Sequence, residues 1–90
     1  MKIELKKPLA GDRPAEEEDV RGLKRGLNWL GYYTPLETTG VTPLPDARVF
    51  DALRRFQVDH GLPPTGTARP GDETLTRLNR EVAKRLKGER

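Results

Sequence analysis

The chain has 90 residues and a net charge of +3, with 33% hydrophobic and 34% charged residues and no cysteine. This length indicates one small soluble domain with a modest core. The lack of cysteine excludes disulfides, thiolate nucleophiles and thiolate-bound metals.

The first nine residues alternate apolar and polar side chains, which predicts a short extended arm with Ile3 and Leu5 on one side. We assign residues 1–13 to an extended arm and loop, 14–87 to a folded domain and 88–90 to a frayed tail. No hydrophobic signal core and no membrane-spanning apolar run are visible, so we expect no membrane insertion and leave the localisation open. An extracellular role would need another export route, or the sequence is part of a longer protein.

The first helix is predicted to begin between Pro14 and Asp19. Its acidic first residues favour the positive end of the helix dipole. Gly31 is expected to end it, since glycine readily adopts the left-handed conformation of a helix C-cap. Apolar residues recur along one face of this helix, at Val20, Leu23, Leu27 and Leu30.

A glycine turn followed by a helix occurs twice in the chain. Thr39-Gly40 precedes Asp46 and Thr65-Gly66 precedes Asp72, with six residues from each glycine to its aspartate. Aspartate is a preferred N-cap, so the second and third helices are predicted to begin there. Their buried faces are predicted to be Val49, Ala52, Leu53 and Phe56, then Leu75, Leu78, Val82 and Leu86. The predicted fold is all-α, a compact three-helix bundle with two glycine-containing turns.

Several short motifs follow one another in a fixed order: Leu30-Gly31-Tyr32-Tyr33, Thr39-Gly40-Val41, Phe56-Gln57, Gly61-Leu62 and Thr65-Gly66. This ordered set resembles the peptidoglycan-binding-domain-like family, the small three-helix modules attached to many bacterial and phage cell-wall hydrolases. The resemblance covers roughly residues 17–79. It implies non-catalytic binding of peptidoglycan or a muropeptide, which targets a linked or associated wall-active protein. A cell-wall hydrolase or a virion protein would be the expected protein partner.

The chain departs from the pattern of that family at several positions. Lys24 stands where glutamine is usual, and Thr39 and Thr65 stand where aspartate precedes the turn glycines. Val49 stands where threonine usually starts the second helix, and Asp46 resembles a replacement cap one turn earlier.

No enzymatic activity, cofactor or metal is expected. The sequence contains neither serine nor cysteine, and His60 is its one histidine, which removes the usual nucleophile–base pairs and zinc ligand sets. Aspartate and glutamate are numerous enough for a carboxylate pair. Almost all of them fall at predicted helix starts or on exposed faces, where capping and solvation explain them.

A peptidoglycan site needs an aromatic surface for sugar faces, with amides and cations for hydroxyls and peptide carboxylates. The candidate ligand-binding residues are Asn28, Trp29, Tyr32, Tyr33, Arg54 and Gln57. Trp29 is either an exposed stacking platform or the surface that the arm covers through Ile3 and Leu5. One tyrosine is expected to pack into the core and the other to keep its hydroxyl in solvent. The Gln57 amide either holds a neighbouring turn or meets the ligand.

Two other functions remain beside wall binding. A structural or protein-interaction domain would keep the fold without binding sugar, with the arm pairing onto the sheet edge of a partner. A nucleic-acid-binding domain is disfavoured because its basic residues are spread, and the third helix alternates charge at Glu73, Arg77, Glu81 and Arg85.

Overall fold

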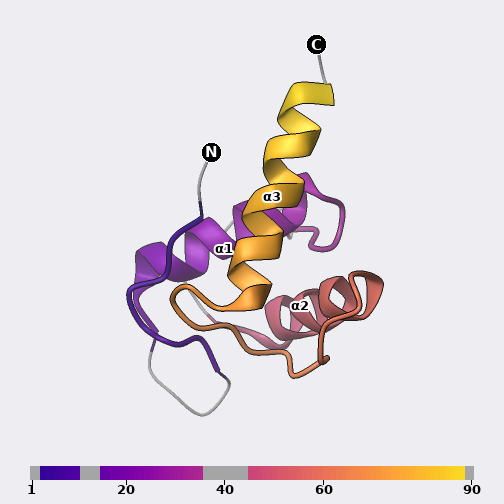
Figure 1. The fold of residues 1–90 in the computed structure, drawn as a ribbon. Helices are drawn as coiled ribbons and strands as arrows, with labels where there is room; N and C mark the ends of the chain where they lie inside the picture. The colour runs from indigo at the N-terminus through magenta and orange to yellow at the C-terminus, as the bar shows by residue number, and fades with distance from the viewer. Residues whose placement is uncertain (1–2, 11–14, 36–44, 89–90) are drawn as a thin grey trace.

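The computed structural model describes residues 3–10, 15–35 and 45–88, and these form three helices without a β-strand (Figure 1). α1 spans Glu17–Trp29, α2 spans Ala47–Asp59 and α3 spans Glu73–Gly88. α1 packs against both other helices. The predicted all-α three-helix class is therefore confirmed. The predicted Thr39-Gly40 turn and residues 11–14 and 89–90 lie outside the described residues.

Both predicted aspartate N-caps are present. Oδ1 of Asp46 accepts a hydrogen bond from the backbone N–H of Val49 at 3.0 Å, and Oδ1 of Asp72 accepts one from Leu75 at 2.8 Å. Each bond satisfies a donor that the first helical turn leaves without an intrahelical partner. The two caps therefore fix where α2 and α3 begin.

α1 ends at Trp29 with Leu30 as its C-cap, and Gly31, the glycine expected to stop it, follows directly. Gly31 has a φ of 89°, a left-handed conformation that costs a residue without a Cβ little. The chain reversal lets the N–H of Tyr32 bond the carbonyl of Leu27 at 2.8 Å, which closes the last turn. α2 ends with the same pattern, in which Leu62 bonds the carbonyl of Gln57 at 2.8 Å.

The core lies where the apolar faces of the three helices meet. Its fully buried helical side chains are Val20, Leu23, Leu27, Val49, Ala52, Leu53, Phe56, Leu78 and Val82. Leu75 is also buried, and Leu30 packs against this cluster while partly exposed. The prediction that Leu86 belongs to the buried face of α3 is wrong, because its side chain is 40% exposed. The final turns of α3 project beyond α1 and α2 (Figure 1).

The arm contributes side chains to the same core. Ile3, Leu5 and Leu9 are all buried. Ile3 crosses α1 at Gly26, where an added Cβ would lie 2.2 Å from Cδ1 of Ile3. Glycine at this position therefore lets the arm approach the helix closely. Residues 3–10 of the predicted arm therefore pack into the same core as the helices.

Polar side chains on two helices hold the backbone of the arm. Asn79 on α3 accepts from the N–H of Ile3 at 2.7 Å and donates to its carbonyl at 2.9 Å. The buried carboxylate of Asp19 on α1 accepts from the N–H groups of Lys6 and Lys7, at 2.8 and 3.2 Å. These bonds replace the water that an isolated extended segment would need.

Lys24 is fully buried on α1, and its ammonium group meets Asp46 and Tyr33. Nζ lies 3.2 Å from Oδ2 of Asp46 and 5.5 Å from the centre of the Tyr33 ring. The carboxylate of Asp46 thus caps α2 with one oxygen and pairs with α1 through the other. The two departures from the family pattern at these positions are therefore in contact with each other.

We expect Asn79→Ala to lower the free energy of unfolding by about 1–3 kcal/mol, because both backbone groups of Ile3 lose their partner. Asn28→Ala is the matched control, since Asn28 is exposed on α1. Urea denaturation of both variants measures the difference. Equal stabilities would show that the Asn79 bonds do not hold the arm in solution.

Candidate functional site

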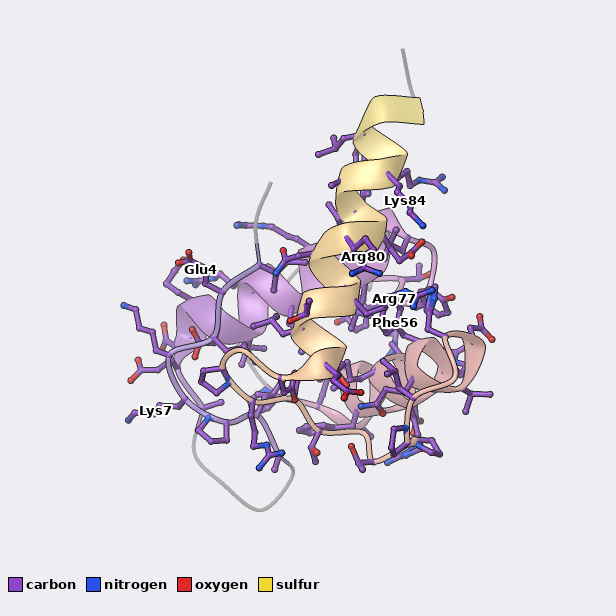
Figure 2. The ribbon with its side chains drawn as sticks, viewed as in Figure 1. Glu4, Lys7, Phe56, Arg77, Arg80 and Lys84 are labelled. Atoms are coloured by element: carbon purple, nitrogen blue, oxygen red, sulfur yellow. The ribbon has the colours of Figure 1, made fainter. Side chains whose placement is uncertain are left out.

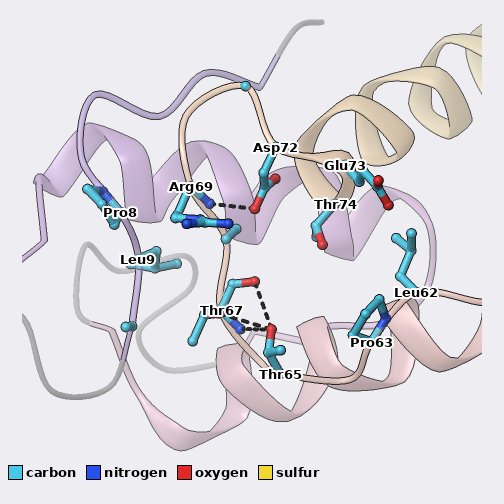
Figure 3. Close-up of a pocket in the computed structure, with 13 residues that line it drawn as sticks. Pro8, Leu9, Leu62, Pro63, Thr65, Thr67, Arg69, Asp72, Glu73 and Thr74 are labelled. Atoms are coloured by element: carbon cyan, nitrogen blue, oxygen red, sulfur yellow. Dashed lines mark hydrogen bonds between the residues drawn. The ribbon is translucent and has the colours of Figure 1, made fainter.

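A groove of about 910 Å³ is lined by the end of the arm, by the segment that joins α2 to α3 and by the first turn of α3 (Figure 3). Pro8, Leu9 and Ala10 are the arm residues of this lining. Leu9 and Ala68 join the two segments through an antiparallel bridge with N–H···O distances of 2.7 and 3.1 Å. The groove therefore depends on pairing between segments far apart in the sequence.

The side chain of Gln57 lies beneath this groove and organises its lining. Its Oε1 accepts from the N–H of Gly66 at 2.8 Å. Its Nε2 lies 3.0 Å from the carbonyl of Thr67, 3.1 Å from the hydroxyl of Thr74 and 3.3 Å from that of Thr65. One amide thus fixes the turn after α2 against the start of α3. Because Gln57 is only 1% exposed, these bonds form away from water, and breaking them would leave buried polar groups without partners, which destabilises the fold.

Gly66 is required at this turn for two reasons. Its φ of 72° lies in the left-handed region. An added Cβ would also lie 3.0 Å from a terminal nitrogen of Arg54, whose guanidinium covers the turn. Arg54 pairs with Asp51 one turn earlier on α2 at 2.6 Å. The predicted Gly66 turn is thus present, and Arg54 packs against its outer side.

Short polar bonds stiffen the remainder of the lining. The hydroxyl of Thr65 accepts from the N–H of Thr67 at 3.2 Å. The second carboxylate oxygen of Asp72 accepts from the N–H of Arg69 at 2.8 Å, as the dashed line in Figure 3 shows. Asp72 therefore holds the loop that precedes α3 with one carboxylate oxygen and caps the helix with the other.

The lining combines apolar faces with hydroxyl and charged groups. Pro8, Leu62 and Pro63 supply apolar surface, whereas Thr65 and Thr67 supply hydroxyls. Arg69 is exposed and adds a cation, and Asp72 and Glu73 add carboxylates. Such a surface suits a ligand that has both C–H faces and many hydroxyls. The lining contains no aromatic ring, so proline and leucine take the place of the expected stacking platform.

Two of the sequence candidates lie inside the protein. Tyr33 is 5% exposed and packs in the core, and Gln57 is bonded entirely to the turn that it supports. Both side chains are buried, and the Gln57 amide holds a neighbouring turn, one of the two roles expected for it. The expectation that one tyrosine packs in the core is met by Tyr33.

Tyr32 lies on the surface in a cluster where α1 and α2 end. Its ring meets Phe56 edge-on, with the ring centres 5.5 Å apart, and its hydroxyl donates to Asp59 at 2.7 Å. Partial burial, together with this hydrogen bond and the negative charge of Asp59, raises the pKa of Tyr32 to about 12. His60 stacks against Phe56 in the same cluster, with ring centres 4.3 Å apart. Tyr32 thus connects two helix ends.

The other candidates are spread over the surface. Asn28 is exposed on α1, and Arg54 is exposed on α2. Trp29 is partly buried against the core, and its indole Nε1 is enclosed without a hydrogen-bond partner among the described residues. None of the six sequence candidates lines the groove, although Gln57 supports its floor.

Sequence reasoning missed most of the groove residues. Arg69, Thr67 and Thr74 follow the second turn, and Pro8 to Ala10 belong to the arm. The run of threonines from Thr65 to Thr76 is the signal that could have drawn attention to this segment. Nothing local in the sequence pairs that segment with the arm.

Two searches, one for metal-binding groups and one for membrane-spanning helices, apply to the part of the chain that the structure describes. There, no group of three or more His, Cys, Asp or Glu side chains could hold a metal ion. In the same ranges, no helix has both the length and the apolar character that crossing a bilayer requires.

A family model described as "Putative peptidoglycan binding domain" matches residues 16–78, well over half of the chain. This range contains α1, α2 and the start of α3, together with most of the groove lining. It excludes the arm and Asn79, which the structure shows bound to each other. Searches of curated proteins and of solved structures gave no match.

We expect Gln57→Glu to lower the free energy of unfolding by about 2–3 kcal/mol at pH 7, since a buried carboxylate cannot donate to the Thr67 carbonyl. Burial and this carbonyl should hold the folded pKa of the introduced carboxyl above its unfolded value of about 4.3. Its stability deficit should therefore shrink as the pH falls through that raised pKa, because the protonated form can donate. Gln57→Leu is the control and should show a deficit that is independent of pH.

We expect the Tyr32 phenol to titrate near pH 12 and Asp59→Asn to lower that pKa, because a hydrogen-bond acceptor and a negative charge are both lost. Folding favours the protonated phenol, so its contribution to stability is complete below pH 10 and is lost as the pH rises towards 12. Absorbance at the phenolate band in a Tyr33→Phe background measures Tyr32 alone. Asp51→Asn, on the same helix, should leave the pKa unchanged.

Proposed function

The chain belongs to the peptidoglycan-binding domain family, and we propose that its groove holds the wall polymer without cleaving it. In this role the domain would keep a linked or associated wall-active protein concentrated on its polymer. The observation that carries the proposal is the groove itself, in which threonine hydroxyls and apolar side chains share one lining above the Gln57 amide.

Peptidoglycan matches this lining in chemical terms. Its sugar rings have apolar C–H faces that can pack on Pro8, Leu62 and Pro63, and hydroxyls that can bond Thr65 or Thr67. The Gln57 bonds hold the turn in one shape before any ligand arrives, which lowers the entropy cost of binding. A shallow, mixed surface of this kind supports weak binding per site, which suits attachment to a repetitive polymer.

The carboxylates in the groove favour binding over hydrolysis. Asp72 uses one oxygen to cap α3 and the other to hold the Arg69 backbone. Glu73 is its sequence neighbour and the other carboxylate in the lining. Glycoside hydrolysis needs two carboxyl groups on opposite sides of the scissile bond, one of which donates a proton. Both oxygens of Asp72 accept backbone hydrogen bonds, which favour its ionised form over the protonated form that a proton donor needs.

The alternative function, a protein-interaction domain that keeps the fold without binding sugar, has the arm pairing with the sheet edge of a partner. The arm backbone already bonds within the chain at Ile3, at Lys6 and Lys7, and at Leu9. Pairing with a partner at these positions would first require those bonds to break. The arm therefore gives this alternative no support.

We expect the wild-type protein to be retained by insoluble peptidoglycan sacculi, and Arg69→Ala to bind about tenfold more weakly through loss of one charged hydrogen-bond donor. Arg25→Ala is the matched control, because Arg25 is exposed on α1 and outside the groove lining. Sedimentation with sacculi measures the bound fraction. Retention of the wild type no greater than that of an unrelated helical protein of similar charge would reject wall binding.

A further inference from the structure

A second hollow of about 270 Å³ lies alongside α3. Leu62, Gly71 and Glu73 line both hollows, so the two are neighbours. The smaller one adds Thr76, Arg77 and Arg80 to its lining. Arg77 and Arg80 are labelled on α3 in Figure 2. All the residues that distinguish the second hollow therefore come from one helix.

The second hollow is more basic than the first. Arg77 and Arg80 are three residues apart on α3, which places them on neighbouring parts of one helix face. Their two positive charges face one carboxylate, that of Glu73, in the lining. Leu62 adds an apolar side chain beside them. The hollow thus combines a cationic wall with a small apolar surface.

Arg77 is held in place by Glu81, one helical turn further along α3. Its Nε donates to Oε2 of Glu81 at 3.1 Å, and Lys84 lies 3.5 Å from the same oxygen. Partial burial raises the pKa of Glu81, but the hydrogen bond from Arg77 and the charges of Lys84 and His60 outweigh it and lower the pKa overall. Glu81 therefore stays ionised at neutral pH and keeps Arg77 oriented, through one of its five N–H donors.

Resting on the proposed function, we propose that this basic hollow takes a free carboxylate of the wall peptide while the larger groove takes the sugar chain. Arginine binds carboxylates through a planar fork of donors, and Arg77 and Arg80 supply two such groups. Leu62 would contact the aliphatic part of the residue that carries the carboxylate. The two hollows share Leu62, Gly71 and Glu73, and this proximity matches a ligand in which peptide and sugar are covalently joined.

The charges around the hollow favour a single carboxylate over an extended polyanion. Glu73 lies in the lining and Glu81 lies against Arg77. A polymer with one phosphate on every unit would bring further negative charge next to these two groups. A lone carboxylate can meet Arg77 and Arg80 without that repulsion.

The test compares a soluble disaccharide–peptide muropeptide with the same compound after its carboxylates have been amidated. Isothermal titration measures both affinities for the complete chain. We expect the wild type to prefer the free carboxylate form by about tenfold, the size of one charge-assisted hydrogen bond. Arg80→Ala should lose most of this preference, because the Arg80 side chain is exposed in the hollow and its removal disturbs no core contact.

Arg25→Ala, an equal change of charge outside both hollows, should keep the full preference for the free carboxylate. Equal wild-type affinity for the two muropeptides would overturn the inference, and retention on sacculi would then show that wall binding itself survives. A preference that persists undiminished in Arg80→Ala would also overturn it, since the carboxylate would then bind elsewhere. Absence of both sacculus and muropeptide binding would instead reject the proposed function.

Discussion

The groove depends on the hydrogen bonds that the side-chain amide of Gln57 makes. A turn that redirects the chain between two helices leaves backbone groups without partners, and here one buried side chain satisfies the N–H of Gly66 and the carbonyl of Thr67. Phe56, the preceding residue, is fully buried in the core. Two adjacent residues of α2 thus anchor the hydrophobic centre and the turn that lines the groove, so packing of the core also positions the groove.

The features that short sequence patterns could predict were those set by local interactions. Asp46 and Asp72 cap their helices through bonds to residues three positions away, and the leucines of α1 repeat at helical spacing. Leu86 continues the same periodicity on α3 but is exposed, because periodicity does not show how far the neighbouring helices extend. Periodicity therefore identifies the apolar face of a helix. Whether a residue on that face is buried also depends on another element that covers it.

The candidate site was harder to predict because an amide or a phenol looks the same in a sequence whether it serves the protein or a ligand. Gln57 and Tyr33 carry suitable groups for sugar binding, and both are buried. The groove lining also comes from the arm, which contacts the turn through Leu9 and Ala68 and contacts α3 through Asn79. These contacts join residues that are far apart in the sequence, so a periodic pattern of apolar residues does not predict them. The salt bridge of Lys24 was likewise not predictable from neighbouring residues, because Asp46 is 22 residues away.

The bond between Ile3 and Asn79 also has a consequence for biosynthesis. During translation the arm is made well before its partner on α3, because Ile3 and Asn79 are 76 residues apart. Until α3 emerges, the backbone of Ile3 and the apolar side chains around it lack their final cover. The domain should thus complete its folding only after α3 has left the ribosome, which leaves an interval in which ribosome-associated chaperones could bind.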